Sequence, residues 1–350
     1  MEKTVGIIGA SYSGLSAAIS AAKEGAGVKV YEKKTDITQF ACGEIYTSGW
    51  YGVETPPKNC RYYAAKNFIF HFSDENIAIP LPRDSLWVTE RAAIQKKMYD
   101  TAKDYGVKFN LGESKLITET VKDYDYVIDA SGFPSQSGYE GYFEKIRPQA
   151  AALYYDVSGD FSEYFDKDLH FWWTTSDNHG YVWLFPKTED KTNIGIGWEN
   201  KTREVPKFKD IKTFFQKNLK ISINYNEVGK KRGAGILPLD RVKHFTHDNV
   251  AIVGEAAGLM NYTVEAGAHF AIASGRESGI AAAKGSLSDY DNYVKSELLK
   301  EVDISKMLYK KIGGMSQEKF RKVCKGIAKG AGMEIFHSKV KFLGLLRHMF

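Results

Sequence analysis

The pattern of apolar residues at the start of the chain predicts a strand, a tight turn, a helix and a second strand. Residues 5–8 form an apolar run of the length of a buried strand, and the apolar residues of segment 15–19 recur at helical spacing. Val28 and Val30 then begin the next strand. Small residues fill the turn before the helix, so the chain opens with a compact strand–turn–helix–strand unit.

Further along, the hydrophobic period changes from that of a helix to that of a sheet. Residues 67–72, NFIFHF, place phenylalanine at every second position, and IAIPLP returns after the polar stretch SDEN, which predicts a β-hairpin. A helix is expected from Glu90 to Tyr105, ended by Gly106, and YDYVIDASG adds a buried strand. The chain therefore leaves the first unit, forms a hairpin and returns.

Two aromatic segments in the middle of the chain predict an antiparallel sheet. In GYVWLFPK, Tyr181, Trp183 and Phe185 lie on one side of a strand, and Val182 and Leu184 lie on the other. The preceding segment LHFWWTT would extend the same aromatic face. Such a face is either ordinary core or the wall of a long apolar slot, and the pattern alone leaves both open.

The first turn has the spacing of a dinucleotide-binding loop. Gly9, Ser11 and Gly14 occupy the glycine positions of G-x-G-x-x-G, and Glu32 ends the second strand. Gly9 permits the turn, Gly14 lets the helix lie close to the strand, and the helix N-terminus can bind a pyrophosphate. Glu32 would accept hydrogen bonds from an adenosine ribose. Ser11 departs from the pattern but is small; a plain strand–helix–strand unit is the alternative.

A second small-residue turn, AIVGEAAG, lies at residues 251–258. The chain does not continue the strand–helix alternation of a nicotinamide dehydrogenase, and an inserted hairpin before the return to the sheet is typical of flavoproteins of the p-hydroxybenzoate hydroxylase type. The turn resembles their G-D motif, with Glu255 in place of the usual aspartate. VEAGAHFAIASG resembles their turn into a helix that faces the flavin, although a small-residue packing helix is the alternative.

Four stretches together resemble the geranylgeranyl reductase family of FAD-dependent oxidoreductases. They are GASYSG with VYEKK, CGE at residues 42–44, YVWLFPKTEDKTNIGIG and GEAAGLMN. The third is the most specific, because the family has Y-x-W-x-F-P-K followed by G-x-G, and Gly195 and Gly197 fit that spacing. The resemblance extends roughly over residues 1–285, and the family usually has a larger C-terminal portion than this chain.

The fold that the resemblance implies is α/β (α+β overall). It comprises a Rossmann-like FAD-binding domain, an inserted antiparallel β-sheet substrate domain and a helical C-terminus. The expected boundaries are residues 1–66, 83–145 and 236–285 for the FAD-binding domain, 67–82 and 146–235 for the substrate domain, and 286–350 for a basic helical C-terminal segment.

The resemblance also implies roles for individual residues. The adenosine and pyrophosphate half of FAD would contact Gly9, Ser11, Ser13, Gly14, Glu32 and Lys33, and Arg91 would bind a phosphate or ribityl oxygen. The ribityl and flavin half would contact Gly43, Glu44, Tyr46, Gly254, Glu255, Gly258, Gly267 and Ala268. The substrate would contact Tyr181, Trp183 and Phe185. Cys42 and Tyr181 are the candidate catalytic residues, although a buried, inert thiol explains Cys42 equally well.

The chain departs from the family pattern close to the expected flavin. Glu265 stands where relatives usually have glycine, and a carboxylate there would oppose charge on the reduced flavin unless it points away or is protonated. His269 stands where relatives favour an apolar or aromatic residue. These departures bear on the flavin geometry and on the redox partner.

The implied activity is reduction of isolated C=C bonds in a geranylgeranyl-type prenyl chain, of a membrane lipid or its precursor such as a prenyl diphosphate. The chain has one dinucleotide loop, so electrons are expected from an external donor: NAD(P)H, ferredoxin or another reductant. A flavin-dependent monooxygenase or halogenase acting on a small aromatic or apolar substrate is the alternative. A non-catalytic FAD-binding protein is a third hypothesis.

Composition and charge narrow the setting. Three cysteines without paired spacing argue against disulfides and against a metal site, so neither a disulfide nor a bound metal is expected. The opening lacks a secretory pattern and no apolar run would span a bilayer, so a cytoplasmic protein is expected.

The C-terminal part of the chain is basic: from Lys306 onward it contains eleven Lys and Arg residues and only two Glu residues. This tail either lies on an anionic membrane surface or closes the substrate slot with Phe320, Val323, Ile327, Phe342, Leu345 and Leu346. No nucleic-acid partner is expected.

Overall fold

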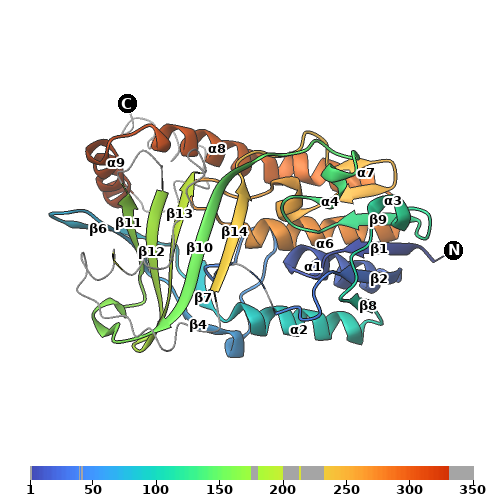
Figure 1. Ribbon diagram of the computed structural model, residues 1–350, viewed down its shortest axis with the longest axis horizontal. Coiled ribbons are helices and arrows are strands. Elements are labelled where there is room, and N and C mark those ends of the chain that lie inside the picture. Colours follow the sequence, from blue (N-terminus) through green and yellow to red (C-terminus); the bar gives the residue numbers. More distant parts are fainter. Residues whose placement is uncertain are drawn as a thin grey trace.

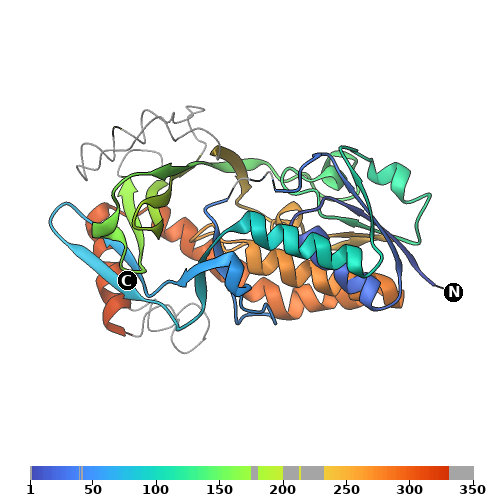
Figure 2. The ribbon, with the colours of Figure 1, turned by 90° about the horizontal axis from the view of Figure 1, so that it is seen from below.

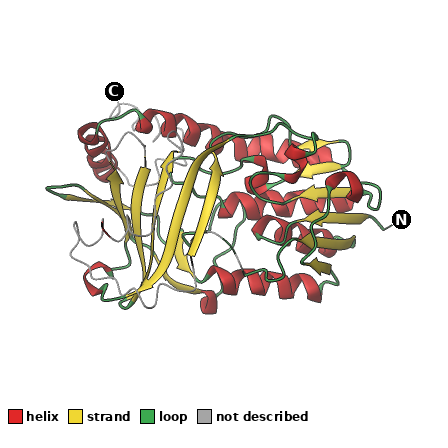
Figure 3. Ribbon diagram, viewed as in Figure 1, coloured by secondary structure: helices red, strands yellow, loops and turns green. Residues whose placement is uncertain are grey.

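The computed structural model describes residues 2–38, 40, 42–174, 180–199, 213 and 232–330. Its strands form sheets of six, seven and three strands. Figure 1 shows the seven-stranded sheet in the left half of the molecule and the six-stranded sheet in the right half. Helices gather around the six-stranded sheet and along the upper edge (Figure 3). The α/β fold expected from the sequence is confirmed.

The six-stranded sheet has the order β15-β16-β9-β1-β2-β8 and is parallel except at its β15–β16 edge. The opening unit is confirmed, because β1, α1 and β2 follow one another as expected. The strands are β1 (Thr4–Ile8), β2 (Gly27–Glu32), β8 (Lys108–Leu111), β9 (Tyr126–Asp129), β15 (Thr246–His247) and β16 (Val250–Ile252). The helices beside them are α1 (Tyr12–Lys23), α2 (Arg91–Asp104), α3 (Ile117–Thr120), α4 (Gln136–Tyr139) and α6 (Ala268–Lys284).

Helices α1 and α6 pack unusually closely, because glycines of α6 meet the backbone of α1. A Cβ on Gly275 would lie 2.2 Å from the carbonyl oxygen of Ser13, and one on Gly279 would lie 2.3 Å from that of Ala17. Figure 2 shows α2 (teal) and α6 (orange) running in nearly the same direction. Both helices begin beside the loop after β1, so the turns before α1, α2 and α6 lie close together.

The seven-stranded sheet has the order β14-β10-β13-β12-β11-β5-β6. The hairpin expected near residue 70 is confirmed as β5–β6, and it joins the edge of this sheet. The sheet is antiparallel except between β11 and β5, which come from distant parts of the chain and pair in parallel. Its strands are β5 (Asn67–His71), β6 (Asn76–Pro80), β10 (Pro148–Ser158), β11 (Leu169–Thr174), β12 (Gly180–Thr188), β13 (Lys191–Glu199) and β14 (Arg232–Pro238).

The pairing of β12 with β13 explains why the aromatic motif needs two following glycines. Tyr181 stands opposite Gly197 and Trp183 stands opposite Gly195. A Cβ on Gly195 would lie 2.1 Å from the Trp183 ring, so only glycine lets that ring lie across the neighbouring strand. Tyr181, Trp183 and Phe185 face one core cluster, and Val182 and Leu184 face another, as the alternation predicts.

The three-stranded sheet joins the hairpin region to α2. It consists of β3 (Ile45–Thr47), β7 (Leu86–Thr89) and β4 (Arg61–Ala64), in that order. Helix α2 begins directly after β7. The loop that enters β3 carries residues 42–44, so this small sheet sets the position of the CGE motif.

The C-terminal part of the described chain is helical, with α7 (Leu287–Tyr293), α8 (Leu299–Gly313) and α9 (Gln317–Gly330). Phe320 of α9 stacks on Trp173 at a ring-centroid distance of 4.4 Å and meets Phe70 edge-on at 5.5 Å. Val323 and Ile327 are buried with it. Of the two interpretations of the tail, slot closure therefore holds for these three residues. Phe342, Leu345 and Leu346 lie outside the described residues.

Within the described residues, no helix is both long and apolar enough to cross a membrane. The division into domains at the expected boundaries stays a prediction. The two large sheets nevertheless have distinct cores, one around the six-stranded sheet and others on the two faces of the seven-stranded sheet.

Candidate active site

A cavity of about 570 Å³ runs from the end of β2 to the aromatic face of β12. Most of the residues predicted from the sequence line it. These are Gly9, Ser11, Ser13, Glu32, Lys33, Cys42, Gly43, Arg91, Tyr181, Trp183, Phe185, Glu255, Gly267 and Ala268. Its volume lies within the range of ligand sites in proteins.

At one end, the loop after β1 is too tight for any residue but glycine at two positions. Gly9 has φ +104°, and a Cβ there would lie 2.2 Å from the carbonyl oxygen of Ala130. A Cβ on Gly14 would lie 1.9 Å from the carbonyl oxygen of Gly9. Gly14 therefore does not line the cavity itself. It allows α1 to approach the loop, and so sets where the helix N-terminus points.

The N-terminus of α1 opens into the cavity without a cap. Ser11 makes no side-chain cap, and the first turn contains no acidic residue. Ser11, Tyr12 and Ser13 line the cavity, so the partial positive charge of the helix end faces it. Such an end favours a phosphate group.

Arg91 adds a full positive charge beside this helix end. Its Nη2 donates to Ser11 Oγ at 2.8 Å, and its guanidinium lies 4.6 Å from the ring centroids of Tyr12 and Phe40. Its buried Nε has no hydrogen-bond partner among the described residues. A buried donor without a partner is rare, so this atom indicates an anionic ligand between Arg91 and α1.

Glu32 stands beside the loop after β1, at the end of the cavity away from the aromatic wall, and two backbone groups hold it. Oε2 accepts a hydrogen bond from Ala10 N at 2.8 Å, and Oε1 accepts one from Lys34 N at 2.9 Å. Lys33 also lines this end. A fixed carboxylate of this kind can accept hydrogen bonds from ribose hydroxyls, and the adenosine-binding role of Glu32 stays a prediction.

The second small-residue turn meets the same cavity. Gly254 and Gly258 have φ +58° and +74°, and a Cβ on Gly258 would lie 2.1 Å from the carbonyl oxygen of Asp240. These two glycines shape the turn and do not line the cavity. Between them, Glu255 does line it. Burial raises the pKa of Glu255, and the guanidinium of Arg91 acts in the opposite direction.

Helix α6 also begins at the cavity without a cap. Its N-cap is Gly267, which has no side chain to bond the first turn, and the first turn contains no acidic residue. Gly267 and Ala268 line the cavity. Two uncapped helix ends, a buried arginine and two glycine-lined turns therefore surround one elongated space. The residues present fit an elongated, phosphate-bearing dinucleotide such as FAD.

The other end of the cavity is an aromatic wall. Tyr181, Trp183, Phe185, Phe68 and Phe171 line it. A second cavity of about 70 Å³ lies beneath α8 and α9 and shares Phe68, Phe171 and Tyr181 with the first. The apolar wall therefore continues from the flavin region toward the C-terminal helices, as a slot for an apolar chain requires.

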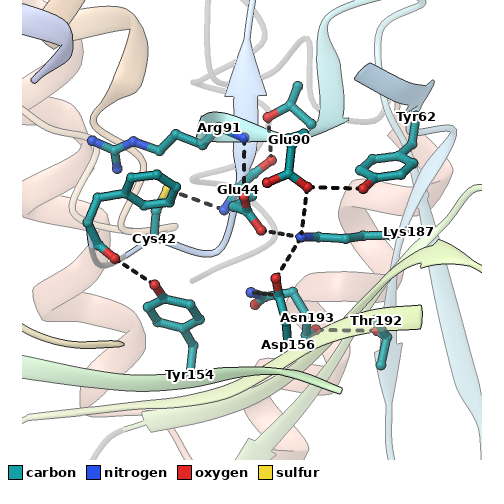
Figure 4. Close-up of polar contacts among 12 residues, drawn as sticks. Cys42, Glu44, Tyr62, Glu90, Arg91, Tyr154, Asp156, Lys187, Thr192 and Asn193 are labelled. Carbon is teal, nitrogen blue, oxygen red and sulfur yellow. Dashed lines mark hydrogen bonds and ion pairs between the residues drawn. The ribbon is translucent and has the colours of Figure 1, made fainter. Parts of the chain in front are cut away.

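A buried ionic cluster supports the wall from behind (Figure 4). Lys187 Nζ contacts a carboxylate oxygen of Glu44 and lies 2.9 Å from Asp156 Oδ2, and the Lys187 and Glu44 side chains are only 4% and 2% exposed. Burial by itself would lower the pKa of Lys187, but the two carboxylates outweigh it and raise the pKa, so the ammonium stays charged. Glu90 Oε2 lies 3.9 Å from the same ammonium, so the cluster is a buried Lys187–Glu44 ion pair with two further carboxylates.

Hydrogen bonds connect this cluster to both halves of the cavity. Glu44 Oε1 accepts from Arg91 N at 3.1 Å. On the other side, Asn193 Nδ2 donates to Asp156 Oδ1 at 2.9 Å, and Trp183 Nε1 donates to Asn193 Oδ1 at 2.8 Å. One chain of contacts thus runs from the start of α2 to the aromatic wall.

Two residues of the predicted cofactor loop lie behind the cavity wall. Glu44 does not line the cavity, because its carboxylate is taken up by Lys187 and the start of α2. Tyr46 is buried edge-on against Tyr12, with ring centroids 6.1 Å apart. Cys42 does line the cavity, and its Sγ accepts from Glu44 N at 3.2 Å.

Sequence reasoning missed the partners of Lys187. The FPK motif included the lysine, but nothing in the pattern said that Glu44 and Asp156 would meet it. Asp156 could have indicated such a partner. It is the one charged residue in a mainly apolar strand, and a charge in a buried strand needs a partner of opposite charge. Phe40 and Gln95, which also line the cavity, gave no comparable signal.

Comparison with known proteins agrees with this geometry. Residues 161–234 match the family model described as the geranylgeranyl reductase catalytic domain. Digeranylgeranylglycerophospholipid reductase 2 of Methanosphaera stadtmanae is 27% identical over 339 residues, covering 87% of this chain and 83% of that protein. Digeranylgeranylglycerophospholipid reductase of Methanocaldococcus jannaschii is 24% identical, with coverage of 85% and 80%.

Solved structures share the fold. A geranylgeranyl bacteriochlorophyll reductase-like protein from Thermoplasma acidophilum superposes with a TM-score of 0.80 at 19% identity, covering 100% of this chain and 96% of the other. A flavin-dependent halogenase gives 0.67 at 15% identity, covering 99% and 70%. The family match, the relatives and the cavity agree in supporting an FAD-dependent oxidoreductase similar to the geranylgeranyl reductases.

Proposed function

We propose that the protein reduces isolated C=C bonds of a geranylgeranyl-type prenyl chain, in a membrane lipid or its precursor, with FAD as the cofactor. The observation that carries the proposal is the continuous path from an FAD-shaped cradle to an aromatic wall and on to the apolar space beneath α9. The named relatives are reductases of digeranylgeranylglycerophospholipid, which carries such chains.

Different residues along the cavity bind different parts of the cofactor and the substrate. Ser11, Ser13 and Arg91 bind the pyrophosphate, Glu32 holds the adenosine ribose, and Glu255, Gly267 and Ala268 surround the ribityl and flavin region. Reduced FAD, when bound, supplies a hydride. Trp183, Phe185 and Phe171 hold the prenyl chain against it and exclude water, because an unpolarised alkene depends mainly on positioning and dry surroundings.

The oxygen-using alternative rests on the fold that the chain shares with halogenases. Reduced protein mixed with air distinguishes the two, because a monooxygenase or halogenase forms a flavin hydroperoxide. We expect reoxidation by air without that species, whereas rapid hydroxylation or halogenation of an added aromatic compound would favour the alternative. The electron donor is external on this proposal, since the cradle holds a single dinucleotide.

Replacing Trp183 by leucine should lower kcat/KM for a prenyl substrate by about tenfold or more, because the loss of apolar contact in a fitted pocket has effects of this size. FAD binding should be unchanged. Trp172→Leu is the matched control: Trp172 lies on the neighbouring strand, equally buried, and faces the opposite core. Mass spectrometry of the product gives the rate. Equal rates in both variants would remove Trp183 from the substrate wall.

Peripheral attachment to an anionic membrane is the second part of the proposal. The outer face of α9 exposes Lys319, Lys322, Lys325 and Lys329, while its apolar face is buried on the sheet. Each Lys near an anionic surface contributes about 1 kcal/mol. The protein should therefore sediment with vesicles containing anionic lipid at low salt, and replacing these four lysines by glutamine should abolish this while flavin remains bound. Equal sedimentation with neutral vesicles would contradict an electrostatic contact.

A further inference from the structure

Glu265 lines the cavity between the start of α6 and the aromatic wall. It precedes Gly267, the N-cap of α6, and lines the main cavity beside Ala266 and Met260. Its side chain is partly exposed, toward the cavity that it lines. Since Gly267 and Ala268 form the expected flavin contact, Glu265 stands between that contact and the aromatic wall.

The backbone holds this glutamate in a conformation that favours glycine. Glu265 has φ +51°. The turn is closed by paired hydrogen bonds between Asn261 and Ala266, of 2.9 and 3.2 Å, and Asn261 Oδ1 accepts a further bond from Thr263 N at 3.1 Å. Backbone strain of this kind persists where the surroundings enforce it, and it is concentrated at functional sites.

The surroundings of the carboxyl group are almost entirely neutral. Tyr181 Oη donates to Glu265 Oε2 at 3.2 Å. None of the ion pairs found between described side chains includes Glu265. Burial raises the pKa of Glu265 to about 7, and the Tyr181 hydroxyl lowers it only in part.

Gly197 leaves the space that this carboxyl group occupies. A Cβ at position 197 would lie 3.2 Å from Glu265 Oε2 and 3.7 Å from Oε1. The second glycine of the G-x-G motif therefore accommodates both Tyr181, its cross-strand neighbour, and Glu265. Three independent parts of the chain, β12, β13 and the turn before α6, place this group.

We propose that Glu265 is the catalytic acid that protonates the alkene, and that Tyr181 positions it. The inference rests on the proposed function. One alkene carbon takes a hydride from the reduced cofactor, which is thereby oxidised. The π electron pair takes the proton of the Glu265 carboxyl on the other carbon. The carboxylate that remains keeps the hydrogen bond from Tyr181 Oη and regains a proton from solvent.

Tyr181 fits the role of orienting Glu265 better than the role of the proton donor. Burial, followed by the nearby Glu265 carboxyl, raises the pKa of Tyr181 well above its usual value, so its proton is held tightly. The hydroxyl is moreover directed at Oε2. Its hydrogen bond stabilises the carboxylate produced by proton transfer, which is the part expected of a positioning residue.

Glu265→Gln should lower the rate of a single turnover, in which pre-reduced protein reduces a prenyl substrate, by about 10²–10⁴-fold. Bound FAD and reduction of that FAD by dithionite should be unchanged. In the wild type this rate should be constant below about pH 7 and fall above it, because the acid form is lost. Tyr181→Phe should shift the fall to higher pH, since the carboxylate loses its donor. Glu277→Gln, on α6 and away from the cavity, is the control.

Infrared spectroscopy of the cofactor-free protein gives a readout that needs no turnover. The carbonyl band of a protonated carboxyl should titrate near pH 7 in the wild type, shift upward in Tyr181→Phe and be missing in Glu265→Gln. An active wild type with an equally active Glu265→Gln variant would overturn the role of Glu265 and leave the proposed function standing. A wild type that reduces no prenyl chain would overturn both.

Discussion

Gly14→Ala should yield a protein without bound flavin. A single added Cβ would lie 1.9 Å from the carbonyl oxygen of Gly9, and neither group can move away, because both belong to backbone packed in the core. The helix must therefore shift outward, which carries the α1 N-terminus away from the pyrophosphate position. The measurement is the ratio of flavin to protein absorbance after purification, followed by titration of the apoprotein with FAD.

Gly27→Ala is the matched control, because a Cβ there meets no atom closer than 3.6 Å. It should keep its flavin. Circular dichroism should show a folded Gly14→Ala protein, which separates loss of the cradle from loss of the fold. A folded Gly14→Ala variant that binds FAD as tightly as the wild type would contradict the assignment of this loop.

Lys187→Met should lower the free energy of unfolding by about 3–5 kcal/mol at neutral pH, since it leaves the buried carboxylate of Glu44 and the partly buried carboxylate of Asp156 without their cation. The loss should become smaller as the pH falls. Burial raises the pKa of Glu44 and the Lys187 ammonium opposes this, so without the ammonium the folded state takes up more protons at Glu44 than the unfolded state does as the pH falls. Urea denaturation at several pH values measures both effects.

Lys191→Met provides the comparison, because Lys191 is exposed at the start of the next strand. It should change stability by less than about 0.5 kcal/mol, as most surface substitutions do. Adding Glu44→Gln to Lys187→Met should restore part of the loss, since one buried charge is then removed. If the Lys187→Met protein were as stable as Lys191→Met, the ion pairs of Lys187 would not contribute to stability.

The sequence predicted the parts of the fold whose signals are local. The opening unit, the hairpin near residue 70 and the two-sided strand around Trp183 depend on alternation, on helical spacing and on glycine turns, and all three are confirmed. The parallel pairing of β5 with β11 could not be predicted, because it joins segments about a hundred residues apart and no local pattern records which sheet edge a hairpin will join.

The site shows the same division. Gly9, Glu32 and Gly267 could be placed because turns and strand ends bring them to the cavity by backbone geometry alone. The Lys187 cluster could not, since its four charged members come from the loop before β3, from the residue before α2 and from two different strands. Glu265 was noticed as a departure from the family pattern, but its contact with Tyr181 became visible only in three dimensions.

We expect this cavity to couple flavin oxidation to saturation of a prenyl double bond. The direct measurement is an anaerobic single turnover, in which photoreduced protein is mixed with a geranylgeranyl lipid and followed by absorbance and by mass spectrometry. We expect the oxidised flavin spectrum to return as the lipid gains two hydrogen atoms for each flavin oxidised. A flavin that stays reduced with every prenyl lipid, although air reoxidises it, would show that the cavity does not couple the two reactions.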